Sequence, residues 1–372
     1  MVSAIIAVSL IFTVITLRLA FEWRQALADI DAMIVTPIDL DLELLGEPAA
    51  EPATEPATNI VVSHTSPVHD ELFGPPSAPV VEGEQVEAPV AAVPDEPIPT
   101  LSQPTLNVLL LGTDARPQDT EPTRTDALVL VRIERESGRV SMLSIPRDLW
   151  VNYPSGGEGR INAAYALGER RFGPGGGAAL AKSTVGGLLG LKVDHFVLIN
   201  FQGFEALIDL LGGITVDVPE PLYDPAYPTE DYGTMEVRFE AGPQRLNAER
   251  ALIYARTRHA DSDFGRNQRQ QQVLMAIFER IRDRGLLQQL TSLDNYTGAM
   301  RDYVKTDLNR KRMLELAGFA RGINADQIVR YAIDSHAIVD LRSPATFAAE
   351  PAALNRIVRQ FTGEAVSTAG GQ

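Results

Sequence analysis

From about residue 105 onward, apolar positions come in runs whose lengths alternate between those of strands and those of helices. Strand-length apolar runs rich in β-branched residues are typical of a sheet that is covered on both faces. Three such runs come first: Asn107–Leu111, Ala127–Ile133 and Val140–Ile145. The elements expected after them are a helix, a strand, a helix and a strand, over Ala178–Leu189, Phe196–Phe201, Phe204–Leu211 and Ile214–Val218. This order predicts an α/β layered domain with a mixed central sheet.

The first 28 residues form a separate, strongly apolar segment. Val2–Leu17 contains no charged residue, and the apolar run continues past Arg18 to Trp23. Since about 20 mostly apolar residues suffice for a helix to cross a bilayer, we expect residues 1–28 to be a transmembrane anchor. No Lys or Arg precedes the run whereas Arg18 and Arg24 follow it, which is opposite to the pattern for an N-terminus facing the cytoplasm. A start codon placed too late, or a cleaved signal peptide, would account for this pattern.

Residues 29–104 are predicted to be an extended linker. Within them, Thr36–Pro104 holds 13 Asp or Glu, no Lys or Arg, and 13 of the 25 prolines, and it includes the tandem EPATEPAT. Such proline-rich, self-repelling sequence does not build a core and behaves as a spacer. It carries 13 of the 16 net negative charges, so the rest of the chain is nearly neutral.

Cysteine content and charge exclude several kinds of site. The chain has no cysteine, which excludes disulfides and cysteine-based nucleophiles or metal sites. The segment Thr105–Gly285 holds 21 basic and 24 acidic residues and shows neither a helix-turn-helix pattern nor a basic stripe. Nucleic acid is therefore not an expected partner.

Polar residues cluster where the predicted strands begin or end. Asp114 follows the first strand, and Arg124 and Asp126 precede the second. Ligands bind at such strand ends in α/β sheets. Asp114 and Asp126 therefore form a candidate Mg²⁺ site, because Mg²⁺ takes one or two carboxylates and completes its shell with water and phosphate oxygens. The alternative is that Asp114 caps a turn and that Arg124 pairs with Asp126 on the surface.

Two further arginines follow the third strand. Pro146 ends that strand and leaves Arg147 at its tip, and Arg160 comes after a Gly-rich loop. Each of these arginines either contacts a ligand phosphate or forms an ordinary ion pair with a neighbour.

The segment Leu246–Ile277 is the densest in candidate chemistry. Asn247 is predicted to cap a helix, after which Arg256 and Arg258 lie on one side if the chain is extended there. A second helix, beginning near Asp263, carries a stripe at helical spacing made of Arg266, Arg269, Gln270, Val273 and Ile277. Because a helix N-terminus attracts anions, this face is expected to bind a phosphate and to continue as an apolar wall. The alternative is an ordinary amphipathic helix with its arginines solvated.

Taken together, these segments resemble the LytR-CpsA-Psr family of cell-wall assembly proteins. The resemblance covers about Thr105–Arg284 and extends more weakly to about Gly363. No single segment is decisive, but six segments in the same order are very specific. They are NVLLLGTDAR, TRTDALVLVRI, SIPRDLWV, RINAAYA, FQGFEALIDLLGGITVDVP and LNAERALIYARTRHADSDFGRNQRQQQVL.

The resemblance implies a fold, a reaction and partners. The expected fold is a mixed sheet sandwiched between helices, with a hydrophobic pocket for a polyprenyl chain. Residues 105–285 would form the catalytic domain, and residues 286–372 would complete it with helices at Arg310–Gly318 and Ala352–Phe361 before a disordered tail. The implied activity is a Mg²⁺-dependent phosphotransferase that moves a glycopolymer with its phosphate from a polyprenyl pyrophosphate carrier onto peptidoglycan, forming a phosphodiester. A single-pass helix would hold the domain outside the cell membrane.

The resemblance also assigns roles to residues. Asp114 and Asp126 would hold Mg²⁺, and the pyrophosphate would be bound by Arg124, Arg147, Arg160, Arg256, Arg258, Arg269 and Gln270. The stripe on the second helix adds Arg266 to this set. Because phosphoryl transfer needs cations and a base, we further expect Arg147, Arg256 and Arg258 to act as catalytic clamps and Asp126 to help to deprotonate the acceptor hydroxyl. Arg160 stands where family members often have lysine, which keeps the charge but changes the geometry. The alternatives are a non-catalytic protein that binds polyprenyl phosphate or glycan, and a transcriptional attenuator.

Overall fold

In a computed structural model of the chain, the described residues all belong to one compact unit. They are 28–29, 31–36, 38, 101–116, 119, 121–229, 233–258, 262–283, 300–341 and 346–364. All of the predicted anchor (1–28) except Ala28, most of the predicted linker (29–104) and residues 365–372, where a tail is predicted, therefore lie outside the described residues. None of the helices described is long and apolar enough to span a bilayer.

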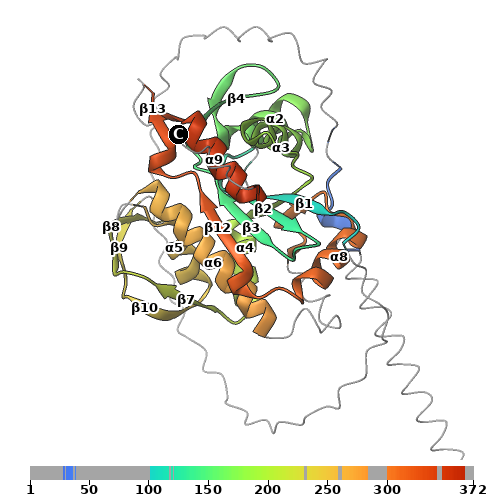
Figure 1. The fold of residues 1–372 in the computed structure, drawn as a ribbon. Helices are drawn as coiled ribbons and strands as arrows, with labels where there is room; N and C mark the ends of the chain where they lie inside the picture. The colour runs from blue at the N-terminus through green and yellow to red at the C-terminus, as the bar shows by residue number, and fades with distance from the viewer. Residues whose placement is uncertain are drawn as a thin grey trace, which may run out of the picture. The chain divides into compact units, whose positions relative to one another are not determined.

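A mixed sheet lies at the centre of the unit (Figure 1). Over the described residues it has six strands in the order β11-β6-β1-β2-β3-β12. β1 is parallel to β6 and antiparallel to β2, and β2 is antiparallel to β3. As a result, the C-terminal ends of β1, β3 and β6 and the N-terminal end of β2 lie along the same side of the sheet. The strands are β1 Thr105–Thr113, β2 Thr125–Glu134, β3 Val140–Ser144, β6 His195–Asn200, β11 Val304–Thr306 and β12 Ile328–Ala332.

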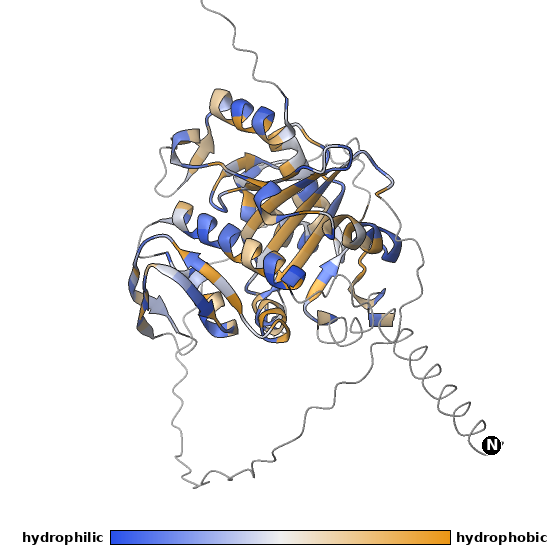
Figure 2. Ribbon diagram, turned by 60° about the horizontal axis from the view of Figure 1, so that its bottom comes forward, coloured by the Kyte–Doolittle hydropathy of each residue, from blue (hydrophilic) through white to orange (hydrophobic). Residues whose placement is uncertain are grey.

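Helices cover both faces of this sheet, as the sequence predicts (Figure 1). α2, α3 and α9 pack on one face, whereas α6 and α8 lie against the other. The central strands are predominantly hydrophobic, which agrees with burial on both faces (Figure 2). The helices are α2 Ala164–Phe172, α3 Gly176–Leu189, α4 Phe201–Leu210, α5 Ala248–Arg256, α6 Asp263–Asp283, α8 Arg310–Ala320 and α9 Pro351–Thr362, with 3-10 turns at Ile161–Ala163, Ala325–Gln327 and Ser335–Ala337.

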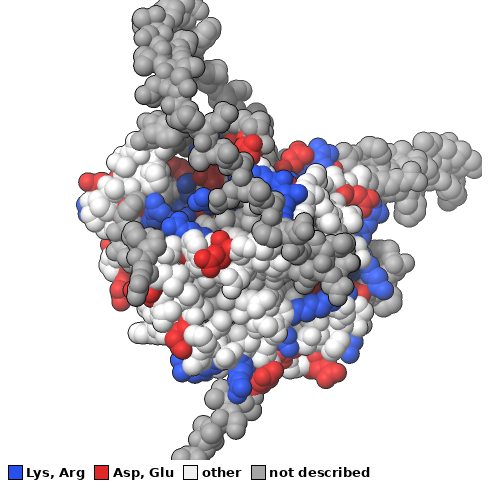
Figure 3. Space-filling model, turned by 90° about the horizontal axis from the view of Figure 1, so that it is seen from above, with Lys and Arg blue, Asp and Glu red and all other residues white. Residues whose placement is uncertain are grey.

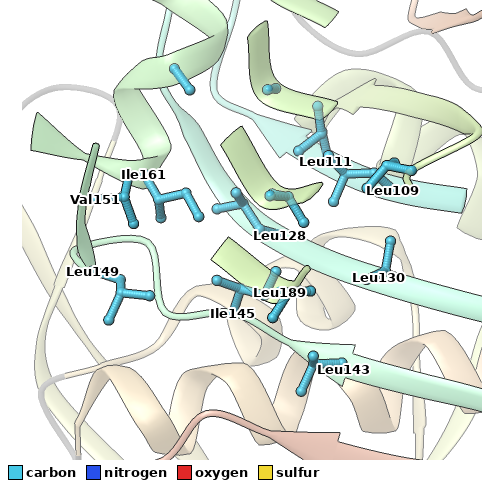
Figure 4. Close-up of a cluster of buried hydrophobic side chains, with 14 of the residues drawn as sticks. Leu109, Leu111, Leu128, Leu130, Leu143, Ile145, Leu149, Val151, Ile161 and Leu189 are labelled. Carbon is cyan, nitrogen blue, oxygen red and sulfur yellow. The ribbon is translucent and has the colours of Figure 1, made fainter. Parts of the chain in front are cut away.

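The main hydrophobic core lies between the central sheet and α3. Leu109 and Leu111 of β1 point into it together with Leu128 and Leu130 of β2, because alternate residues of a strand face the same side (Figure 4). Leu189 of α3 packs against these strands in the same cluster. This core fixes the strands whose ends carry the candidate site.

A second core lies beside the sheet and joins α4, α5 and α6 to two small sheets. Val216, Phe239 and Tyr254 are buried in it, with the Phe239 and Tyr254 rings packed edge to face at 5.0 Å between centroids. This arrangement holds α5 and the hairpin β8–β9 next to the end of the central sheet. The two-stranded sheets of the unit pair β7 Ile214–Val218 with β10 Gly242–Leu246, β8 Leu222–Pro228 with β9 Thr234–Phe239, β4 Trp150–Asn152 with β5 Glu158–Arg160, and β13 Ile338–Asp340 with β14 Phe347–Ala349.

The predicted boundary between β6 and α4 is wrong by three residues. Phe201 was expected to end the strand and Phe204 to begin the helix, but α4 begins at Phe201. Asn200 is the cause, because its side-chain oxygen accepts a hydrogen bond from Gly203 N at 2.9 Å and so caps the helix there.

The segments that flank the predicted domain take part in the sheet. Residues 286–372 were expected to add helices alone, yet they also supply β11 and β12, the two edge strands. Near the N-terminus, a segment predicted to be linker packs on the unit: Met33 is buried, Asp29 pairs with Arg301 at 3.0 Å, and Val35 N donates to Thr306 O at 2.7 Å. β11, with three residues, and the short docked segment are too brief to show a periodicity.

Candidate functional site

A cavity of about 200 Å³ opens at the edge where β1, β3 and β6 end and β2 begins. Six of the predicted site residues line it: Asp126, Arg147, Arg256, Arg258, Arg266 and Gln270. They come from β2, the turn after β3, α5 and the segment after it, and α6. The fold thus brings together residues that lie up to about 140 positions apart in the sequence. We call this space the central cavity.

Arg147 is held by carboxylates on two sides. Its Nη1 donates to Asp126 Oδ1 at 2.5 Å, and its Nε lies 3.6 Å from both Asp148 Oδ2 and Asp263 Oδ1. Burial alone would lower the pKa of Arg147, but the neighbouring Asp126, Asp263 and Asp148 charges raise it above its ordinary value. Arg147 therefore stays a fixed positive charge beside Asp126.

Arg266, which is buried, and the partly buried Asp263 form an ion pair at the start of α6. Arg266 Nη2 lies 2.6 Å from Asp263 Oδ1, and Arg266 is 4% exposed. Burial raises the pKa of Asp263 and lowers the pKa of Arg266, so desolvation outweighs their attraction in both residues. A guanidinium nevertheless remains protonated, because its ordinary pKa is above 12. Ser262 Oγ accepts from Gly265 N at 3.3 Å, which caps this helix start.

Arg256 and Arg258 both line the central cavity, as predicted. α5 begins after Asn247, whose side chain accepts from Arg250 N at 2.9 Å, and it ends at Arg256. Thr257 then turns extended, with φ −51° and ψ 133°, and is fully buried. The side chains on either side of a buried extended residue point the opposite way, here toward the cavity.

The hairpin β8–β9 adds residues that the sequence did not indicate. Asp224 and Tyr227 line the cavity and are 1% and 5% exposed. In a regular strand, residues three apart face opposite sides, but the pairing with β9 shifts between Asp224 and Tyr227, and both turn inward. The sequence held one indication of this bulge, Pro225 within a strand-like run, since proline in a strand commonly marks a bulge.

An outer cavity adjoins the central one on the other side of Asp126. Asp114, Arg124 and Asp126 line it together with three charged residues not predicted, Arg116, Asp119 and Arg170. Burial raises the pKa of Asp114, and the nearby charge of Asp126 raises it further, whereas Arg256 acts in the opposite direction. Asp114 and Asp126 therefore share one open space with Asp119, and these carboxylates repel each other.

The donor set of this outer cavity fits a hard divalent cation. Among the residues that the structure describes, no group of three or more His, Asp or Glu side chains comes together to hold a metal by itself. Mg²⁺ needs only one or two carboxylates when phosphate oxygens and water complete its shell, and Asp114 and Asp126 match that requirement.

Two predicted phosphate ligands do not line either cavity. Arg269 is 6% exposed and donates to two backbone carbonyls, Tyr254 O at 3.1 Å and Thr257 O. Arg160 Nη1 lies 3.3 Å from Asp148 Oδ1. Arg269 therefore connects α6 to the end of α5 by hydrogen bonds, and Arg160 forms an ion pair with Asp148.

The predicted apolar continuation of the α6 stripe is part of a core. Val273 and Ile277 are buried in the second core with α4 and α5. Apolar groups at the central cavity come instead from Ala127, Phe201 and Pro228. The apolar part of the stripe consequently holds α6 against the second core, and only the first two turns of the helix reach the cavity.

The arrangement suits a multiply charged anion. Arg256, Arg258 and Arg266 converge with Arg147 on one small space, and planar guanidinium groups match phosphate oxygens in geometry. Seen from above, basic and acidic side chains lie side by side on the described surface rather than in a basic stripe (Figure 3). The concentration of cations is thus local to the cavity, which fits a compact phosphate group better than a nucleic-acid backbone.

Comparisons with known proteins show which proteins this chain is similar to. A family model described as the LytR_cpsA_psr family matches residues 81–356. The chain is 34% identical over 227 residues to the polyisoprenyl-teichoic acid–peptidoglycan teichoic acid transferase TagT of Bacillus subtilis (strain 168), a match that spans 60% of this chain and 66% of TagT. The crystal structure of B. subtilis TagV is similar with a TM-score of 0.56 and 27% identity, covering 71% of this chain and 98% of that one. A structure of TagT bound to LI-WTA gives a TM-score of 0.53 and 28% identity, covering 70% and 91%.

Proposed function

The chain belongs to the LytR-CpsA-Psr family, and we propose that it is a phosphotransferase acting on a lipid-linked glycopolymer. The glycopolymer, with its phosphate, would pass from a polyprenyl pyrophosphate carrier to peptidoglycan and form a phosphodiester there. The observation that carries the proposal is the convergence of Arg147, Arg256, Arg258 and Arg266 on one cavity beside Asp126. The name of TagT, a teichoic acid transferase, supports the same reaction class.

The reaction requires one bond to form and one to break at a single phosphorus. A hydroxyl oxygen of the acceptor bonds to the phosphorus next to the glycan, and the bond from that phosphorus to the oxygen bridging to the lipid phosphate breaks. Polyprenyl monophosphate leaves. The proton of the acceptor hydroxyl passes to Asp126, whose Oδ2 is the candidate atom because Oδ1 already accepts from Arg147.

The arginines supply most of the rate enhancement in this scheme. Negative charge spreads over the equatorial oxygens of the transferred phosphoryl group, and preorganised cations stabilise it without reorganisation. Arg256 and Arg258 grip the pyrophosphate from the end of α5, and Arg147 faces them from the turn after β3. Gln270 adds an amide donor from α6. Arg124 contributes from the outer cavity.

Asp114 and Asp126 are the residues that would hold Mg²⁺. When bound there, the ion would neutralise charge on the phosphate oxygens. Both carboxylates border the outer cavity, and the ion pair with Arg147 keeps Asp126 in a fixed position.

The cellular setting is part of the same proposal. Residues 1–28 would anchor the chain in the cell membrane by a single helix, with the catalytic unit on the extracytoplasmic side, where peptidoglycan is found. The partners would be the polyprenyl-linked glycan and the peptidoglycan acceptor. Composition supports the anchor, because Val2–Leu17 contains no charged residue.

The test is transfer by the purified full chain in liposomes that contain a polyprenyl-pyrophosphate-linked glycopolymer, with peptidoglycan as acceptor and Mg²⁺ present. Arg256→Ala and Asp126→Asn are each expected to lower the transfer rate by roughly 10²- to 10³-fold, with the thermal unfolding midpoint little changed. Arg250→Ala is the matched control, because Arg250 lies on the same helix but stacks on Phe239 outside the cavity. Full activity in both site variants would contradict the proposal, and carrier binding without turnover would indicate a non-catalytic protein.

A further inference from the structure

Arg256 is held in place by uncharged groups. Its guanidinium carbon lies 4.4 Å from the centre of the Phe201 ring and 5.8 Å from that of Tyr227. Its Nη1 also donates to the Tyr227 hydroxyl at 3.3 Å. The side chain therefore has an aromatic ring against one of its faces and a neutral hydrogen-bond acceptor at one of its edges.

Two other arginines of the central cavity are held differently. Arg147 and Arg266 are ion-paired with Asp126 and Asp263 at 2.5 and 2.6 Å. For Arg256, by contrast, no carboxylate of the described residues lies within ion-pair distance. A carboxylate would fix the guanidinium but would also neutralise it. An aromatic face and a hydroxyl fix its orientation and leave its positive charge available to an anion.

The two aromatic residues reach Arg256 from separate parts of the chain. Phe201 is the first residue of α4, and the Asn200 cap fixes where that helix starts, directly at the end of β6. Tyr227 is turned inward by the shift in pairing between β8 and β9. Burial raises the pKa of Tyr227, so its hydroxyl stays protonated and neutral beside the arginine. Two local irregularities, a capped helix start and a bulge, thus converge on one guanidinium.

We infer that Phe201 and Tyr227 are positioning residues that hold Arg256 in the orientation in which it binds a phosphate of the donor. The inference rests on the proposed function, because the phosphate is that of the carrier. It assigns to the hairpin β8–β9 a task in the site, which Tyr227 performs. Phe201 and Tyr227 act through Arg256 and do not themselves contact the transferred group.

The test measures binding of inorganic pyrophosphate to the full chain by calorimetry in the presence of Mg²⁺. Phe201→Leu removes the ring and keeps apolar bulk, and Tyr227→Phe removes only the hydroxyl. Each is expected to weaken binding by about 3- to 30-fold. Phe201→Tyr, which keeps the aromatic face, is expected to retain the affinity of the wild-type chain. In an Arg256→Gln background, Phe201→Leu is expected to have no further effect, because the residue through which it acts is gone.

Matched controls separate this role from a loss of packing. Phe204→Leu alters a second phenylalanine of α4 that packs on the second core and lies outside the cavity. Tyr223→Phe alters a second tyrosine of β8, which stacks with Arg238 at 4.4 Å on the surface. Both controls are expected to bind pyrophosphate as the wild-type chain does.

The outcomes distinguish the inference from the proposed function. Wild-type affinity in Phe201→Leu and Tyr227→Phe, or the same loss with and without Arg256, would overturn the inference. Failure of the wild-type chain to bind pyrophosphate would overturn it too, and the transfer assay would then judge the proposed function separately. If the chain binds pyrophosphate, loses that binding in the variants and yet transfers nothing, the inference stands and the proposed function fails.

Discussion

At the scale of single residues, two arginines thirteen positions apart have opposite kinds of partners. Arg256 contacts a ring and a hydroxyl and faces a cavity, whereas Arg269 is buried and donates to the carbonyls of Tyr254 and Thr257. Both were predicted to bind phosphate, because sequence spacing places both near a helix end. Arg269 instead holds Thr257, the extended residue between Arg256 and Arg258, in place.

This contrast predicts different effects of removing each arginine. Arg269→Met leaves two buried carbonyl groups without that donor, and we expect it to lower the free energy of unfolding by about 2 to 4 kcal/mol. Arg256→Ala is expected to cost less than about 1 kcal/mol, since Arg256 satisfies no buried backbone group. Urea denaturation of both variants measures the difference. If Arg269→Met lost only transfer activity and kept its stability, the phosphate-binding role predicted for Arg269 would be favoured again.

The sequence could predict which residue types meet at the site, but not every direction in which they point. Asp126, Arg147 and Arg256 were identified because they adjoin strand or helix ends, which are local features. The carbonyls of Tyr254 and Thr257 that Arg269 contacts could not be foreseen, because sequence spacing does not say whether a backbone carbonyl or a ligand lies opposite a side chain. Tyr227 was missed because a bulge, which depends on the partner strand, decides the side to which it turns.

At the scale of elements, α2 and α3 approach so closely that their backbones nearly touch. A Cβ on Gly168 would lie 2.3 Å from Gly176 O and 2.8 Å from Gly177 Cα. These atoms belong to backbone at the start of α3, which cannot move aside without moving the helix. The close approach holds α3 against the sheet that carries the site.

Gly168→Ala is therefore expected to be destabilising by about 3 kcal/mol, since the added methyl group overlaps backbone atoms. Gly187→Ala is the matched control, because Gly187 lies within α3 with nothing within 4 Å of its added Cβ. It is expected to be neutral or to stabilise by up to about 1 kcal/mol, as alanine favours a helix over glycine. Circular dichroism during urea denaturation measures both. Equal stability of the two variants would show that the helices can separate without cost.

Long, strongly patterned elements were predictable, and short ones were not. β1, β2, β3, α5 and α6 appear where apolar periodicity and the Asn247 cap indicated them. β11 has three residues, and such a strand is stabilised by the sheet edge to which it pairs rather than by its own sequence. The edge strands of the central sheet thus follow from tertiary contacts that no local pattern records.

At the scale of the whole molecule, a partly buried network of charged and polar groups ties three distant parts of the chain together. Asp307, just after β11, pairs with Lys182 of α3 at 2.6 Å and with His195 of β6 at 3.3 Å. Its Oδ1 also accepts from Phe196 N at 2.8 Å. The segment after β11 is thereby fixed to β6 and α3, at the end of the sheet opposite to the site.

The network predicts how stability depends on pH. Burial raises the pKa of Asp307, but the hydrogen bonds from His195, Lys182 and Phe196 outweigh it and hold the pKa below the ordinary carboxyl value of 3.8. The unfolded chain therefore takes up this proton at a higher pH than the native one. The contribution of Asp307 is thus fully present above about pH 4 and is lost as the pH falls through the lower native pKa.

Asp307→Asn is expected to lower the free energy of unfolding by about 1 to 3 kcal/mol at pH 7, because Asn keeps the acceptor for Phe196 N but loses the charge opposite Lys182. Urea denaturation between pH 7 and pH 3 measures the difference from the wild-type chain, which should shrink below about pH 4 as Asp307 becomes protonated. Asp302→Asn is the control, since its side chain is 73% exposed and its pairing with Arg301 should contribute at most about 0.5 kcal/mol. A difference that stayed constant down to pH 3 would mean that Asp307 keeps its charge by some other means, whereas no difference at pH 7 would mean that the ion network does not hold the C-terminal part in place.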